Sequence, residues 1–284
     1  MNPTYMSSSL PLIRVAVLDL NAGLPNQGMR CIREILEKYR EDQQLEMQYD
    51  VFEVRTKDEV PGTDYDIYIS SGGPGSPYDG EGLVWEAKYF QLLTDLQEHN
   101  LKNASSTKHF FFICHSFQIA CRYFGVGQVV KRKSTSFGVF PVHKTEEGNQ
   151  EPILSGLDDP FYVVDSRDWQ VIQPDHEKIE MIGATVLALE KIRPHVDLER
   201  CIMAVRFTDS FFGTQFHPEA DSSGMSAYLQ TEEKRKTIIE NYGLEKFESM
   251  VSQLNDPDKI SLTQSMILPT FLDMAIHARQ SVLS

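Results

Sequence analysis

Cysteine is scarce in this chain of 284 residues, and the four cysteines lie far apart. They form no C-x-x-C pair, and neither they nor the eight histidines have the spacing of zinc ligands. We therefore expect reduced thiols, no metal site and no cofactor. Long apolar runs are also missing, and the first twelve residues lack a basic segment followed by an apolar core. These absences predict no export signal, no membrane insertion and a cytoplasmic location.

Positive charge is in short supply as well. The chain carries 27 Lys and Arg against 41 Asp and Glu, which gives a formal net charge of -14. A charge of this sign opposes electrostatic binding to nucleic acid and to anionic membranes, so neither is expected as a partner. The hydrophobic content of 41% is enough for a large core in one domain, or in a domain with an appendage.

The first half of the chain alternates predicted strands with predicted helices. Because such alternation favours a parallel sheet with right-handed crossovers, we expect an α/β fold with helices on both faces. Ligands of such sheets bind outside the carboxyl ends of the strands. Residues 1–12 are rich in Ser, Pro and Asn and are expected to be a mobile arm. The predicted strands are 13–20, 47–54, 67–70 and 110–113, and the predicted helices are 29–39 and 83–96.

The second half has a different pattern. Short β-rich segments with turn residues between them indicate further strands, which we expect to be antiparallel. A last strand precedes a mostly helical stretch, with one helix expected at 244–254, in which Pro269 should kink or restart a helix. The sequence thus predicts a main domain over 13–221 and a helical C-terminal extension over 222–284. The later strands are expected at 126–144, 161–172, 179–189, 201–207 and 211–216.

Cys114 stands where two periodicities meet. Four apolar residues, Phe110 to Ile113, precede it as a buried strand, and helical spacing begins at Ser116. A residue at a sharp strand-to-helix turn is exposed at the carboxyl end of the sheet, where the first turn of the helix favours negative charge. Cys114 is therefore a candidate nucleophile, with the backbone N–H of His115 placed for an oxyanion. The simpler interpretation is a buried, inert cysteine.

Two other segments end at the same expected edge of the sheet. His217 and Glu219 follow the last strand, and alternation along an extended segment lets the carboxylate lie behind the imidazole. A glycine-rich loop, Gly72-Gly73-Pro74-Gly75, follows the strand at 67–70 and could bring a second N–H donor to the oxyanion. Each fragment alone is weak evidence, but their joint occurrence in this order points to cysteine-based acyl chemistry.

These motifs resemble those of the class I glutamine amidotransferases, including the GMP synthase type. The family's SGGPG loop corresponds to 71–75, its G-x-C-x-G-x-Q elbow to 112–118, its G-x-x-P-V segment to 138–142 and its G-x-Q-F-H-P-E signature to 213–219. The resemblance spans about residues 13 to 221 and implies a flavodoxin-like, mostly parallel sheet. It also implies L-glutamine as substrate and release of ammonia to an acceptor on a separate synthetase chain. The C-terminal helices are then candidates for docking that partner, for covering the site, for self-association into a homo-oligomer, or for plain packing.

Residue roles follow from the matched positions. The resemblance makes Cys114 the nucleophile of a γ-glutamyl thioester, His217 the acid and base, and Glu219 the group that orients His217. The oxyanion hole would be formed by the N–H groups of Gly73 and His115. The residues that it places near the substrate are Gly72, Gln118 and Phe140.

Two departures from the family pattern leave other functions open. Phe112 and Ser116 replace the elbow glycines, which suggests a catalytically silent regulatory subunit as one alternative. Residues 165–168 read Asp-Ser-Arg-Asp where many amidotransferases have Ser-His-Gly-Asp, and the Ser-Arg pair resembles the homoserine O-acyltransferases. Arg167 could clamp a substrate carboxylate, or it could be an exposed arginine paired with a neighbouring aspartate. An acyltransferase or a γ-glutamyl hydrolase with the same triad is the second alternative.

Overall fold

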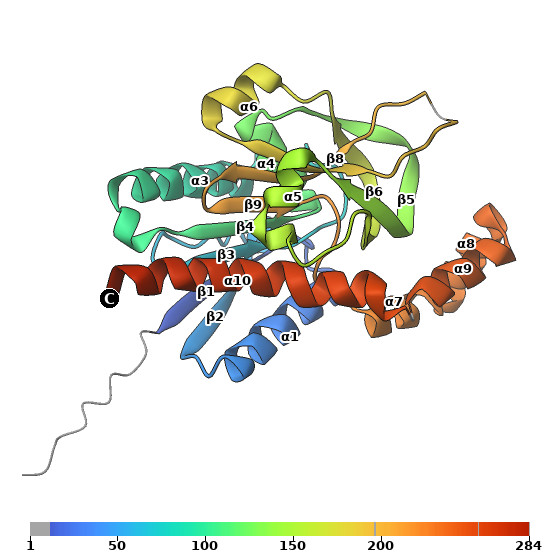
Figure 1. Cartoon of the computed structure of the whole chain (residues 1–284), viewed down its shortest axis with the longest axis horizontal. Coiled ribbons are helices and arrows are strands. Elements are labelled where there is room, and N and C mark those ends of the chain that lie inside the picture. The colour runs from blue at the N-terminus through green and yellow to red at the C-terminus, as the bar shows by residue number, and fades with distance from the viewer. Residues whose placement is uncertain (1–11, 196, 255, 284) are drawn as a thin grey trace, which may run out of the picture.

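The computed structural model describes residues 12–195, 197–254 and 256–283. The arm expected at 1–12 falls almost entirely outside the described residues. In the described part of the chain, nine strands form one sheet in the order β2-β1-β3-β4-β9-β8-β7-β5-β6 (Figure 1). The strands are β1 Ile13–Asp19, β2 Met47–Glu53, β3 Ile67–Ser70, β4 His109–Ile113, β5 Gln128–Lys144, β6 Phe161–Ile172, β7 Thr185–Glu190, β8 Ile202–Thr208 and β9 Phe211–Thr214.

The sheet is parallel from β2 to β9 and antiparallel from β9 to β6. The predicted fold class, a mostly parallel sheet with helices, is therefore confirmed. The helices are α1 Gln27–Asp42, α2 Val54–Lys57, α3 Val84–Lys102, α4 His115–Phe124, α5 Glu146–Gln150, α6 His176–Ile182, α7 Ser222–Leu229, α8 Glu232–Tyr242, α9 Leu244–Leu254 and α10 Leu262–Leu283. Shorter helical turns lie between them at η1 Ala104–Ser106, η2 Pro152–Leu154 and η3 Pro257–Ser261.

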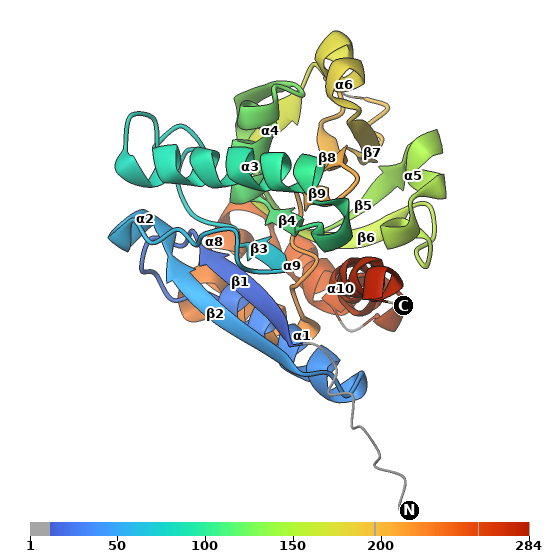
Figure 2. The same cartoon turned by 90° about the vertical axis from the view of Figure 1, so that its left-hand side faces the viewer.

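Both faces of the parallel strands are covered, and Figure 2 shows α3 and α4 on one face with α1 and α10 on the other. Alternation along each strand divides the core accordingly. Phe110 and Phe112 pack toward α3 and α4, whereas Phe111 and Ile113 pack toward α1 and α10. All four side chains have no exposed surface. Burial on both faces explains why β4 is an unbroken apolar run.

One predicted strand is partly wrong. The stretch expected as a strand from 179 to 189 begins with helix α6, and β7 starts only at Thr185. The helix is fixed by local groups, because the Asp175 side chain accepts a hydrogen bond from the N–H of Lys178 at its start. Gly183 ends it in the left-handed conformation, with φ of 69°.

The helices after the last strand pack in two places. Helix α10 joins the core beneath the sheet through Ile267, Leu268 and Phe271, and it continues past Pro269 without ending. Helices α7 to α9 lie against β5 and β6, where Val139 and Val164 share one apolar cluster with Phe247 and other residues of the extension. Among the described residues, no helix combines the length and the hydropathy that crossing a bilayer requires.

Candidate active site

Cys114 occupies a strained turn between β4 and α4. Its backbone has φ of 49° and ψ of -96°, a conformation that residues with a side chain rarely adopt. The N–H of Cys114 donates to the carbonyl of Thr214 on β9 at 2.8 Å, and its own carbonyl accepts from the N–H of Gln118 at 3.0 Å. Strain of this kind is held in place by the surrounding structure and is common where a side chain must face a reactant.

The two residues that replace the family's elbow glycines are both accommodated. Phe112 pairs with Gly213 on β9, and a Cβ at Gly213 would lie 3.1 Å from the Cβ of Phe112. The room for the phenylalanine therefore comes from a glycine on the neighbouring strand. The hydroxyl of Ser116 accepts from the N–H of Ile113 at 2.8 Å and lies 2.8 Å from the carbonyl of Ser70. It thus ties the turn to the strands β3 and β4.

His217 and Glu219 lie together at the end of β9. The Nδ1 of His217 is 2.9 Å from the Oε1 of Glu219, and the His217 N–H donates to the carbonyl of Val164 at 2.9 Å. The Glu219 side chain is 2% exposed and that of His217 is 20% exposed. Burial alone would lower the pKa of His217, but the charges of Glu219 and Cys114, and hydrogen bonds to both, raise that pKa well above its usual value.

The surroundings of Gly72 show that the side chains of Cys114 and His217 lie close together. A Cβ built at Gly72 would lie 2.9 Å from the Cε1 of His217 and 3.6 Å from the Cβ of Cys114. Both side chains therefore border the same small space, which only a glycine leaves open. At Gly73 an added Cβ would collide with the carbonyl of Leu20, so the loop runs closely past the end of β1. Gly72, Gly73, Cys114 and His115 all line one cleft.

The sulfur of Cys114 has two polar neighbours that were not among the residues expected at the site. It lies 3.7 Å from the carbonyl of Ser166 and 3.8 Å from the Nε2 of Gln215. The Gln215 amide is oriented by Gln118, whose Nε2 donates to Gln215 Oε1 at 3.1 Å and lies 3.2 Å from the carbonyl of Trp169. Gln118 lines the cleft, but its amide nitrogen donates to acceptors of the protein itself. The sequence feature that could have indicated Gln215 is its position within the 213–219 signature.

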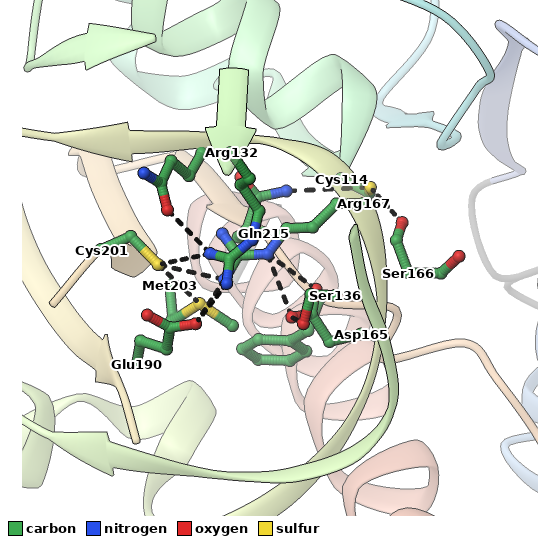
Figure 3. A network of polar contacts seen from close by, with 12 residues as sticks. Cys114, Arg132, Ser136, Asp165, Ser166, Arg167, Glu190, Cys201, Met203 and Gln215 are labelled. Carbon is green, nitrogen blue, oxygen red and sulfur yellow. Dashed lines mark hydrogen bonds and ion pairs between the residues drawn. The ribbon is translucent and has the colours of Figure 1, made fainter. Parts of the chain in front are cut away.

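Arg167 lines the cleft but does not lie in an exposed position. Its side chain is 1% exposed, with Nε 2.9 Å from Asp165 and one terminal nitrogen 3.3 Å from Glu190 and 3.0 Å from the sulfur of Cys201. Figure 3 shows this guanidinium surrounded by these groups, while the amide of Gln215 reaches toward Cys114. Burial opposes the charge, yet Asp165, Cys201 and Glu190 together raise the pKa of Arg167. The expected pairing with Asp165 is present, whereas the expected exposure is wrong.

The cleft in front of Cys114 has a volume of about 640 Å³. One wall comes from the start of α1 and another from α7, whose Met225 and Tyr228 face it. Phe137 and Thr135 of β5 contribute to the lining, but Phe140 is not among the described residues that do. Phe140 lies instead beneath Lys191, whose Nζ is 4.0 Å from the centre of the ring. The structure therefore brings Phe140 to β5 but not to the site.

The remaining titratable groups nearby are poor candidates for the chemistry. Burial, with the charges of Arg55 and Arg122, lowers the pKa of the His115 imidazole to about 3, so this ring is neutral. Burial raises the pKa of the Cys31 thiol to about 11 and that of Cys201 to about 11. Within the part of the chain that the structure describes, no three His, Cys, Asp or Glu side chains cluster in a way that could hold a metal ion.

The fold and the site together define an α/β protein with a cysteine elbow that faces a His-Glu pair at the carboxyl edge of its sheet. Residues 33–234 match the family model described as "Glutamine amidotransferase class-I". Since this match covers more than half of the chain, the protein belongs to the class I glutamine amidotransferase family.

Individual relatives add detail. A homoserine O-acetyltransferase of Clostridium tetani is 32% identical over 127 residues, which are 44% of this chain and 39% of that relative. The match thus spans well under half of that relative's length. A solved glutamine amidotransferase of Thermotoga maritima has a TM-score of 0.64 at 17% identity, covering 93% of this chain and 98% of that one. A putative GMP synthase subunit of Thermoplasma acidophilum has a TM-score of 0.56 at 16% identity, with 96% and 98% covered. At these identities, the two solved structures establish the shared fold.

Proposed function

We propose that the protein is a glutaminase of the amidotransferase type, which hydrolyses the side-chain amide of L-glutamine through a thioester on Cys114. The observation that carries the proposal is the meeting of three side chains in one cleft. The imidazole of His217 borders the same space as Cys114 and bonds to Glu219 at 2.9 Å. A thiol, an imidazole and an orienting carboxylate in this order are the parts that nucleophilic acyl transfer requires.

The first half of the reaction forms the thioester. His217 holds the proton of the thiol, and the thiolate of Cys114 attacks the carboxamide carbon to form a C–S bond. The negative oxygen that results would accept hydrogen bonds from the N–H groups of Gly73 and His115. His217 gives its proton to the amide nitrogen, the C–N bond breaks and ammonia leaves. The raised pKa of His217 suits a group that must carry this proton at neutral pH.

The second half returns the enzyme to its starting state. A water molecule attacks the thioester carbon while His217 accepts one of its protons. The C–S bond then breaks and His217 returns its proton to the sulfur, which yields glutamate and the free thiol. Glu219 keeps Nδ1 of the imidazole occupied in both halves, so the other ring nitrogen is the one that exchanges protons with the reactants.

The ammonia would pass to an acceptor bound by another protein. The Thermoplasma acidophilum relative in fold carries the name of a subunit, which supports a separate synthetase partner for this chain. Helix α7 supports a role for the C-terminal helices in this step, because Asp221, Gly224 and Met225 at its beginning line the cleft. We propose that these helices shape the entrance and present it to the partner.

Ammonia release from glutamine tests the proposal. Wild-type protein should release ammonia, whereas Cys114→Ala and His217→Ala should fall to background, since each removes a reacting group. Cys121→Ala is the matched control, because Cys121 is a fully buried thiol outside the cleft. Background release by the wild type, with candidate synthetases present, would overturn the proposal and favour a silent regulatory subunit.

Acyl transfer to a hydroxyl acceptor is the second candidate. It is favoured by the 32% identity to homoserine O-acetyltransferase and by the Ser-Arg pair at 166–167. The same cysteine would then carry an acyl group from a thioester donor. Mass spectrometry of Cys114 after incubation with acetyl-CoA, with glutamine or with a γ-glutamyl peptide separates the candidates, because each donor leaves a group of its own mass or releases its own product.

A further inference from the structure

Within the described part of the chain, only one of the two carboxylate oxygens of Glu219 has a hydrogen-bond partner. Its Oε1 bonds to the imidazole at 2.9 Å, but its Oε2 is buried and has no hydrogen-bond partner among the described residues. Glu219 is 1% exposed, so bulk solvent does not stabilise this charge. A buried carboxylate needs a source of positive potential beyond one histidine.

The first turn of α1 lies against this carboxylate. A Cβ built at Gly28 would be 2.9 Å from Oε1 of Glu219 and 3.9 Å from its carboxyl carbon. Gly28 is the second residue of α1, after the cap at Asn26, whose side chain accepts from the N–H of Met29 at 2.8 Å. The backbone N–H groups of a first turn, together with the helix dipole, create positive potential.

Helix α1 has no acidic residue of its own in that first turn. A carboxylate is stabilising at this position of a helix, because it complements the dipole. Here the anion near the first turn is Glu219, which comes from a segment far later in the chain. The other charged or titratable groups in this region are Cys31 and Arg30 of α1, Asp221 before α7, and Cys114 with His217.

We propose that the amino terminus of α1 supports the carboxylate of Glu219, and that Gly28 is a positioning residue whose missing side chain allows this approach. The inference rests on the proposed function, since it assigns Glu219 the task of orienting His217. It differs from a packing role, because the nearest atom to an added methyl group is Oε1 of Glu219 at 2.9 Å, followed by Oδ1 of Asn26 at 3.2 Å, and both are side-chain atoms. The easiest response to a methyl group at position 28 is therefore a shift of the carboxylate away from His217.

Gly28→Ala tests the proposal. Alanine favours the helix more than glycine does, so α1 should fold. Any fall in melting temperature should be larger at about pH 6 than at about pH 9, because it reflects the lowered pKa of His217. The rate constant for ammonia release should drop by about 10- to 100-fold, because a small displacement of an orienting group is costly in a preorganised site. Gly62→Ala is the matched control, since Gly62 is exposed and its nearest neighbour is a side-chain oxygen of Asp64 at 3.2 Å.

A second measurement separates positioning from a change in the shape of the cleft, which Gly28 also lines. The pKa of His217, followed by NMR of labelled histidine, should be lower in Gly28→Ala than in the wild type. The reason is that the negative charge of Glu219, which raises this pKa, has moved away from the imidazole. A slower enzyme with an unchanged His217 titration would overturn the proposal, as would a variant with wild-type turnover. This titration needs no substrate, so it remains decisive for Gly28 even if the wild type releases no ammonia.

Discussion

Phe112 and Gly213 are direct partners across the parallel strands β4 and β9, so a side chain that the family lacks fits where the neighbouring strand has none. The ring of Phe112 stacks on that of Phe110 with centroids 4.2 Å apart. Because both residues are fully buried beside the elbow, their packing fixes the path of the chain into Cys114. Phe112 at the position of the elbow glycine is thus accommodated within the core.

Gly213→Ala should destabilise the protein by about 1–3 kcal/mol, because its Cβ would lie 2.9 Å from Cδ2 of Phe117 and 3.1 Å from the Cβ of Phe112. The free energy of unfolding, measured with denaturant, checks this value. Combining it with Phe112→Gly should give less than the sum of the two single effects, since the second change removes the Cβ that the new methyl group would meet at 3.1 Å. Additive effects would contradict this coupling.

Arg167→Gln should cost about 3–5 kcal/mol of stability, because it leaves the buried carboxylate of Asp165 without its cation and removes one of the arginines that pair with Glu190. Denaturant unfolding measures this loss, and Arg193→Gln at a more exposed partner of Glu190 is the comparison. A variant of wild-type stability whose KM for substrate rises tenfold or more would show instead that Arg167 binds the substrate.

Alkylation with iodoacetamide near neutral pH should modify Cys114 before any other thiol. Burial raises the pKa of Cys31 and of Cys201 to about 11, and it raises that of Cys121 as well, so these three remain protonated and unreactive. Cys114 lines the cleft beside His217. Peptide mass spectrometry identifies the modified residue. Faster labelling of Cys31, which also lines the cleft, would contradict this assignment.

Glu219→Gln should lower turnover by about 10²–10⁴-fold, because the imidazole loses the charge that orients it and raises its pKa. The basic limb of the pH–rate profile should also move to lower pH. A folded-state pKa above the unfolded value stabilises the fold below the unfolded pKa, and this stabilisation disappears as pH rises through the folded value.

The wild type should therefore exceed Glu219→Gln in melting temperature by more at about pH 6 than at about pH 9. Thermal unfolding across this range checks the sign. A difference between the two proteins that grows toward alkaline pH would mean that the histidine is not held in its charged form by Glu219.

Much of the fold follows from periodicity alone. The strand at 67–70 and the helix at 244–254 have the predicted bounds, and the meeting of two periods at Cys114 predicts the elbow. The prediction of a strand at 179–182 is wrong. Ile179 and Ile182 suit a strand and a helix equally well, and the capping contacts of Asp175 and Gly183 favour the helix. Local hydrogen bonds of this kind are weak signals in a sequence.

The site is predictable where a motif is contiguous and less so where residues meet across strands. Cys114, His217 and Glu219 come together at one edge of the sheet. Arg167 of β6 lines the cleft, whereas Phe140 of β5 does not, and the pairing of these two strands shifts register between Lys131 and Ser136. Such an irregularity changes which side chains reach the cleft. The contact of Gly28 with Glu219 could not be predicted either, because it depends on how α1 packs against a distant loop.

The most direct test of the account is intact-protein mass spectrometry after rapid mixing with glutamine and acid quenching. We expect a fraction of the protein to gain the mass of one γ-glutamyl group, located on Cys114 by peptide mapping, and we expect this adduct to be absent from Cys114→Ala. An adduct on another residue, or ammonia release that persists in Cys114→Ala, would contradict the central claim that this thiol attacks the amide.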